Sequence, residues 1–256
     1  MTLSIMSPKT RKNIISILIP PAFWLGVWQL AAMAVGMELK LPSPLAVGAA
    51  FVRLMGQPLF WHSALASLLR IFLGVAAGTL LGVLLACATS ASRWADLILS
   101  PAIRVVRATP VVSFILLVWL WVSRTHVPSV ISALMVLPVV WANVCKGISQ
   151  TDRNLLEMAR AYRLGRTRTL RLVYIPSVKP YFASGVNTAM GLAWKSGVAA
   201  EAICLPRLAI GTQIYSSKLD LESPDLFAWT AVVIVLSFAL EHFISRLLEE
   251  GKGGAL

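Results

Sequence analysis

Charged side chains are scarce in this sequence, and acidic ones are the scarcest. Only 13% of the 256 residues are charged and only 11 are acidic, whereas 57% are hydrophobic. A soluble domain of this length needs polar faces along its helices, and this chain has too few polar residues to cover such a surface. Contact with lipid explains the long apolar runs better, so we predict a membrane protein.

Residues that bind metals or carry redox chemistry are few and scattered. The three cysteines, Cys87, Cys145 and Cys204, match no metal or redox spacing and fall in or beside apolar segments. We interpret them as small apolar packing residues. The three histidines are equally dispersed, so we expect neither a metal nor a cofactor.

The sequence also lacks the residue sets that carry catalysis. No segment matches the P-loop pattern G-x-x-x-x-G-K-[ST], so any ATP hydrolysis must come from another polypeptide. We find no nucleophile paired with a base and no paired carboxylates within the apolar segments. We therefore predict that the chain is not an enzyme, and a membrane-embedded enzyme is the least favoured class.

Six apolar segments are long enough to cross a bilayer of ~30 Å as helices, which takes roughly 20 residues each. They cover residues 14–35, 63–88, 102–122, 127–145, 181–203 and 226–247. Backbone groups in lipid must pair within their own segment, so we predict an all-α protein, with proline tolerated inside helices where neighbours satisfy the freed carbonyls. The alternative for 14–35 is a cleaved signal peptide, but this run exceeds the roughly 7–15 residues of such a core. One membrane domain, residues 1–256, is the simplest organisation.

The basic residues are unevenly distributed between the predicted loops. The formal net charge of +12 taken alone suggests nucleic acid. With the N-terminus in the cytoplasm, however, sixteen Lys and Arg residues fall on the inner side and six on the outer side. This asymmetry follows the positive-inside rule, so we predict no nucleic-acid partner and a multi-pass protein with both termini in the cytoplasm.

Small residues recur at every fourth position of the second segment, at Gly74, Gly78, Gly82 and Ala86. These positions share one helix face, and small residues in lipid allow another helix to approach closely. We therefore predict a packing seam, whose partner helix the spacing does not identify. In the outer loop that follows the first segment, the turn residues 42–44 predict a short helix over residues 44–55.

A dense basic block follows the fourth segment. Residues 157–180 hold five arginines and one lysine against one glutamate. A helix cap at Thr151, Asp152 or Asn154, a turn at Gly165 and an end at Pro176 predict two short helices. A mere topology anchor would have scattered charge, whereas this layout suits docking into the groove of a soluble partner.

Charged residues in the spans are functional candidates by default. Lys195, within the fifth segment, is predicted to meet an anionic solute in the translocation pathway or to pair between helices. Glu201, near the outer end of that segment, is predicted to belong to an outer gate or to pair with Arg207. Arg70 is expected to extend toward the membrane surface.

Parts of the chain resemble a known family. The letters E-M-A at residues 157–159 and V-Y-I-P at 173–176 resemble the EAA loop of ABC importer permeases, with no gap between the two parts. Arg163 stands where that family has glycine, which predicts a turn that is shifted toward Gly165 or reshaped. The stretches at 41–44, 107–122 and 191–201 are similar to the sulfonate, nitrate and taurine branch of this family.

This resemblance implies a type I ABC importer permease fold, with six transmembrane helices and a cytoplasmic coupling loop over residues 151–180 between the fourth and fifth. It implies a second permease subunit, with a homodimer favoured over a heterodimer, besides a cytoplasmic ATP-binding subunit and an extracytoplasmic solute-binding protein. The branch that the chain resembles handles small anions, which favours a small anionic solute, and the alternative is a pyrimidine-like or other small organic molecule. The residues that would contact the ATP-binding subunit are Glu157, Ala159, Arg160, Tyr162, Arg163 and Gly165.

The competing function is a secondary carrier or a channel that works without an ATPase. The basic block over residues 157–180 argues against it, and no inverted repeat is visible in the sequence.

Overall fold

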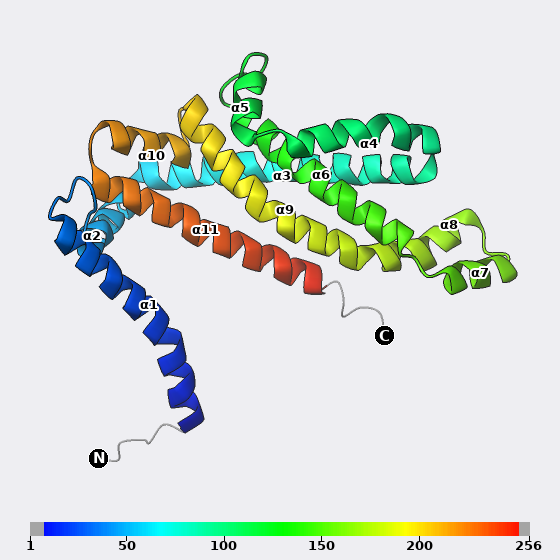
Figure 1. Cartoon of the computed structure of the whole chain (residues 1–256), viewed down its shortest axis with the longest axis horizontal. Helices are drawn as coiled ribbons and strands as arrows, with labels where there is room; N and C mark the ends of the chain where they lie inside the picture. Colours follow the sequence, from blue (N-terminus) through cyan, green and yellow to red (C-terminus); the bar gives the residue numbers. More distant parts are fainter. Residues whose placement is uncertain (1–7, 251–256) are drawn as a thin grey trace. The chain divides into compact units, whose positions relative to one another are not determined.

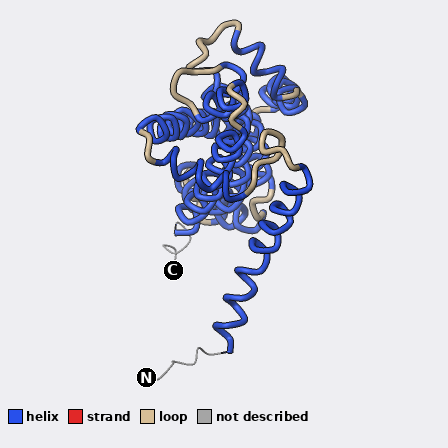
Figure 2. The backbone as a smooth tube through the Cα atoms, turned by 90° about the vertical axis from the view of Figure 1, so that its left-hand side faces the viewer, coloured by secondary structure: helices blue, strands red, loops and turns tan. Residues whose placement is uncertain are grey.

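The computed structural model describes residues 8–250, and the side chains of residues 19–246 within that range. The described residues form helices joined by turns and contain no strand (Figure 2), as the predicted all-α fold requires. Predictions on residues 1–7 and 251–256, including the location of both termini, lie outside this range.

The helices follow one another with short connections (Figure 1). In chain order they are α1 (Pro8–Val35), α2 (Pro44–Met55), α3 (Pro58–Ala91), α4 (Arg93–Ala108), α5 (Val111–Trp119), α6 (Val127–Ser149), α7 (Arg153–Ala161), α8 (Arg166–Thr169), a π-helical turn (Leu170–Tyr174), α9 (Ile175–Cys204), α10 (Ile210–Leu219) and α11 (Ser223–Glu250).

Three described helices are long and apolar enough to cross a membrane. They are α3, α6 and the Ser223–Arg246 part of α11, and α4 with α5 would make a fourth if counted together. The apolar part of α1 with described side chains, Ile19–Val35, is shorter. Each of the six predicted segments lies in these helices or in α9, although length and composition mark only three or four of them as spans.

The third predicted segment, residues 102–122, is not one helix. It breaks between α4 and α5, whose axes differ in direction by 105°. Thr109 has an extended backbone with ψ 134, and Pro110 caps the start of α5 with ψ 135. The prediction of a helix continuing through Pro110 is wrong because a proline ring disfavours the helical conformation of the residue before it.

The chain divides into two compact units, and the first contains α1, α2 and residues 214–231. The predicted short helix is confirmed with the bounds of α2, where the Ser43 hydroxyl accepts a hydrogen bond from the Ala46 amide at 3.2 Å. Aromatic contacts hold this unit together: Trp28 stacks on Phe227 at 6.0 Å and Phe60 on Trp229 at 5.1 Å.

The second unit contains residues 61–213 and 232 onward, and its main feature is the antiparallel pair α6 and α9 (Figure 1). Small residues let the two helices approach closely. A Cβ atom on Gly185 would lie 2.8 Å from Cβ of Asn143, and one on Gly147 would lie 3.1 Å from Cα of Val178. Helices α7 and α8 connect the same end of this pair, so they are held by both helices.

Helix α3 packs on α6 through its glycines. A Cβ atom on Gly78 would lie 2.5 Å from the Ala133 carbonyl oxygen, and one on Gly82 would lie 2.9 Å from that of Leu137. A Cβ atom on Gly74 would overlap the Ser129 carbonyl oxygen. The partner of this glycine face is therefore a helix of the same chain.

Candidate functional site

Helix α7 begins the predicted coupling loop, and its cap is formed by Asp152. The Asp152 carboxylate accepts a hydrogen bond from the Asn154 amide at 2.8 Å. Before the cap, the buried Thr151 hydroxyl donates to the Gly147 carbonyl at 3.2 Å, which ties the loop to the end of α6. Residue types that favour a helix start thus place α7 directly after the end of α6.

An apolar face of α7 remains exposed. Leu155 is 40%, Met158 55% and Tyr162 75% exposed, and their spacing places them on one side of the helix. Ala159 is only 3% exposed and packs inward. Its side chain is therefore covered by this chain, and its place in the contact stays a prediction.

The polar residues predicted for the same contact are exposed. Glu157, Arg160, Arg163 and Gly165 all lie on the surface of the loop. No ion pair joins any of them to another described residue. Together with the apolar face, they leave a mixed apolar and basic surface on an element joined to both α6 and α9.

The turn after α7 is centred on Arg163. Its φ is +51, and the Leu164 amide donates to the Ala159 carbonyl at 2.9 Å while the Arg163 amide donates to that of Arg160 at 2.9 Å. These two bonds define a Schellman end, in which the left-handed residue is usually glycine. Gly165 has φ −64 and ψ 159 and does not use a glycine conformation. The turn is therefore not shifted toward Gly165, because Arg163 itself adopts the strained conformation.

The second predicted helix does not end at Pro176. Helix α8 passes through the π turn directly into α9, and Tyr174 and Ile175 are both helical. In the π turn the Ile175 amide donates to the Leu170 carbonyl, five residues back. This wider turn accommodates Pro176 in the first turn of α9, where a proline without an amide hydrogen is tolerated. Helix α8, the π turn and α9 thus form one continuous helical element.

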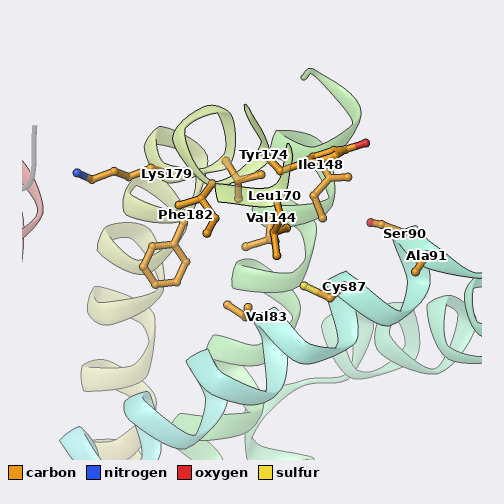
Figure 3. A pocket seen from close by; sticks show the side chains of 12 residues that line it. Val83, Cys87, Ser90, Ala91, Val144, Ile148, Leu170, Tyr174, Lys179 and Phe182 are labelled. Atoms are coloured by element: carbon orange, nitrogen blue, oxygen red, sulfur yellow. The ribbon is translucent and has the colours of Figure 1, made fainter. Parts of the chain in front are cut away.

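An apolar groove lies beside the π turn, and its lining side chains converge from α3, α6 and α9 (Figure 3). Its volume is about 590 Å³. Val144 and Ile148 of α6, Leu170 and Tyr174 of the π turn and Cys87 of α3 all line it. Lys179 is its one charged lining residue and points away from the interior in Figure 3. Any movement of the π turn against α3 therefore changes the width of this groove.

At the opposite end of α9, Glu201 is fully buried and pairs with Arg70 of α3 at 2.7 Å. The alternative pairing with Arg207 is wrong, because Arg207 is exposed while Arg70 reaches the carboxylate across the helix interface. The expectation that Arg70 extends toward the membrane surface is also wrong, since its side chain is only 13% exposed. Ser67, one helical turn before Arg70, is a functional candidate that sequence reasoning missed.

Lys195 is exposed on α9, and no described residue gives it a hydrogen bond or an ion pair. The predicted interhelical pair is therefore not formed within the described part of this chain. Sequence reasoning also overlooked Glu241 of α11, whose carboxylate lies over α9 at Gly191, where an added Cβ atom would be 2.8 Å from Oε1. Glu241 could have been found as an acidic residue inside the sixth apolar segment.

Comparison with known proteins gives consistent matches. Residues 78–249 match the family model for the binding-protein-dependent transport system inner membrane component. A putative aliphatic sulfonates transport permease protein, SsuC of Escherichia coli (strain K12), is 33% identical over 90% of this chain and 87% of its own length. The taurine transport system permease protein TauC of the same organism is 26% identical over 84% of this chain and 80% of its own.

A solved structure supports the fold. The crystal structure of an amino acid ABC transporter with histidines aligns with a TM-score of 0.61, 21% identity and coverage of 75% of this chain and 92% of the other. The described helices thus share their fold with a chain of that transporter.

The chain belongs to the family of binding-protein-dependent transport system inner membrane components. It is a membrane permease subunit of an ABC importer, a class of transporter that works with an ATP-binding subunit and a solute-binding protein.

Proposed function

We propose that this subunit forms the translocation pathway for a small anionic solute of the sulfonate class and is driven by a separate ATP-binding subunit docked on the coupling loop. The exposed face of α7 supports this docking, because its apolar residues lie beside two arginines. The apolar residues are Leu155, Met158 and Tyr162, and the arginines are Arg160 and Arg163.

A cytoplasmic protein, rather than lipid, suits this face. It belongs to a nine-residue helix whose other exposed side chains are mostly charged or polar, so it is not a membrane-spanning surface. An apolar stripe at helical spacing with flanking arginines fits a helix-in-groove contact. Because α7 is joined directly to α6 and through α8 to α9, a partner bound there would act on both helices.

The proposed architecture has six spans, formed by α1, α3, the bent α4 and α5 pair, α6, α9 and α11. Both termini and the coupling loop face the cytoplasm, and an extracytoplasmic solute-binding protein delivers the solute to the other side. A second copy of the chain completes the pathway as a homodimer in the lipid bilayer. The numerous exposed apolar side chains of these helices support contact with lipid and with a second subunit.

The mechanism is alternating access between two packings of similar energy. ATP binding draws the two docked coupling loops together, and the helices joined to them open the pathway outward. Hydrolysis and release of nucleotide restore the inward-open packing. No residue of this chain takes part in the hydrolysis.

Docking is tested by co-purification of the ATP-binding subunit. Replacement of Met158 and Tyr162 by alanine removes most of the exposed apolar area of α7 and should reduce recovery of the ATP-binding subunit at least about tenfold. Leu45→Ala, at an 81% exposed apolar position on α2, is the matched control and should leave recovery unchanged. Solute uptake by the purified chain without any ATP-binding subunit would instead establish a secondary carrier.

The proposed solute class is tested at Lys195, an exposed cation on α9. Lys195→Met should lower the apparent affinity for an alkanesulfonate in transport assays by about tenfold, because one charge-assisted contact is lost. Arg207→Met, at an exposed arginine between α9 and α10, is the control. Unchanged affinity for Lys195→Met would remove this residue from the pathway, and uptake of only uncharged solutes would contradict the anionic class.

A further inference from the structure

We propose that Ser67, Arg70 and Glu201 are positioning residues for transport, which fix the end of α9 and the start of α10 to α3. They would make α3 move together with the end of α9 and the α9–α10 turn (residues 205–209) when the coupling loop displaces α9. This inference rests on the proposed function.

The Glu201 carboxylate is bound from three directions. Arg70 Nη1 donates to Oε1 at 2.7 Å, the Ser67 hydroxyl donates to Oε2 at 2.8 Å and the Gly211 amide donates to Oε2 at 3.2 Å. Glu201 is 0% exposed. A carboxylate this buried is tolerated only with such partners, so its geometry is fixed. The burial also means that Glu201 is not a solute ligand in this packing.

The same α3 side chains hold the α9–α10 turn. Arg70 Nη2 donates to the Leu208 carbonyl at 2.8 Å, and the Ile210 amide donates to the Ser67 hydroxyl at 2.9 Å. The first two amides of α10, those of Ile210 and Gly211, are therefore satisfied by Ser67 and Glu201 and not by a local cap. The Thr212 hydroxyl also donates to the Pro206 carbonyl at 2.7 Å, so α3 supplies part of the polar contacts that hold the turn.

Close packing makes this junction stiff. A Cβ atom on Gly211 would lie 2.5 Å from the Val198 carbonyl oxygen, and one on Gly197 would lie 2.6 Å from Cγ1 of Ile71. The start of α10 thus rests directly on α9, and α9 rests directly on α3. These parts cannot slide past one another without breaking the contacts of Glu201.

Helix α9 connects this junction to the coupling loop. It has 30 residues without a break and so extends about 45 Å. The π turn enters it at one end, and Glu201 lies at the other. A displacement of the loop therefore reaches Glu201 through continuous helix, and the ion pair decides whether α3 follows it.

A buried ion pair is weak evidence for stability, because apolar residues of similar volume often stabilise a fold as well or better. Apolar residues could not make the hydrogen bonds that Arg70, Ser67 and Glu201 make to the turn and to α10. These bonds fix the position of the turn, and we therefore propose that these residues serve transport rather than stability.

The test measures ATP hydrolysed per solute imported, using the complete complex with its ATP-binding subunit and binding protein in proteoliposomes. Glu201→Gln keeps the shape of the side chain but removes the charge that binds Arg70. The ratio should rise about tenfold, because a coupling free energy between α9 and α3 is lost. Arg207→Gln, at an exposed arginine of the same turn, should keep the wild-type ratio.

Ser67→Ala provides a milder variant that preserves the ion pair and the fold. It removes one donor to Glu201 and the acceptor of the Ile210 amide, and the ratio should rise about threefold. A wild-type ratio in every variant that assembles, even with a lower yield of complex, would show that these residues only stabilise the fold and would overturn the inference. A wild-type chain that binds no ATP-binding subunit would refute the proposed function instead.

Discussion

At the scale of the residue, Arg163 is the most unusual position in the coupling loop. It holds a left-handed conformation with φ +51 where the resembled family has glycine. A left-handed residue with a side chain costs roughly 1–2 kcal/mol relative to its favoured conformations. The loop therefore carries strain that its Schellman hydrogen bonds must offset.

Arg163→Gly should relieve this strain and stabilise the turn by about 1 kcal/mol. Hydrogen exchange of the Leu164 amide, which closes the turn, should slow accordingly. Arg163→Val should have the opposite effect, because a β-branched residue is disfavoured at positive φ. Faster exchange in the glycine variant would show that Arg163 is held there by a favourable contact of its side chain.

Residue contacts were predictable only where they are local in sequence. The Asp152 cap follows from residue type alone, because its acceptor and donor lie two positions apart. The Arg70 and Glu201 pair joins residues 131 positions apart, and no local pattern identifies such a partner. The left-handed conformation of Arg163 was not predicted, because residue propensity assigns such a conformation to the nearby Gly165.

At the scale of the element, the approach of α3 to α6 depends on small residues. Gly78→Val would place side-chain carbon against the Ala133 carbonyl and force the helices apart, which should destabilise the protein by about 2–3 kcal/mol or prevent folding. Gly26→Val, on α1 with no atom within 4 Å of the added Cβ, is the matched control. Thermal denaturation in detergent compares the two, and equal losses would argue against a specific packing role.

Helix existence was predictable, but helix continuity was not. Apolar length located α3, α6 and α11 because lipid requires long apolar runs. Two prolines had opposite outcomes: Pro110 ends up between α4 and α5, whereas Pro176 lies inside a helix that continues from a π turn. The difference depends on how the neighbouring backbone bonds are rearranged, which the proline itself does not specify.

At the scale of the whole molecule, the basic coupling loop determines the expected orientation. A cysteine introduced at Arg166 should react with a membrane-impermeant maleimide only from the cytoplasmic side, and one at Leu45 of α2 only from outside, in a chain whose native cysteines are replaced. Labelling in intact cells and in inverted vesicles measures both. Reaction of position 166 in intact cells would contradict the proposed topology and the docking that depends on it.

The class of protein was predictable at this scale because composition and the spacing of the EAA-like residues are properties of the sequence itself. The residues that determine how the helices pack against one another could not be predicted from the sequence. The groove beside the π turn, for example, is lined by residues of α3, α6 and α9 that are far apart in sequence, and lining residues such as Val83 and Phe182 have the same apolar character in sequence as lipid-facing residues.

The π turn at the base of α9 holds one residue more than the same stretch of α-helix would need. If that residue were taken up by regular winding, everything beyond Tyr174 would rotate by about 100° relative to α8 and shift by about 1.5 Å. Such a rotation would redirect Lys195 without melting any part of α9. A small displacement of the loop that converted the π turn to α-helix would therefore change which side chains of α9 face the solute.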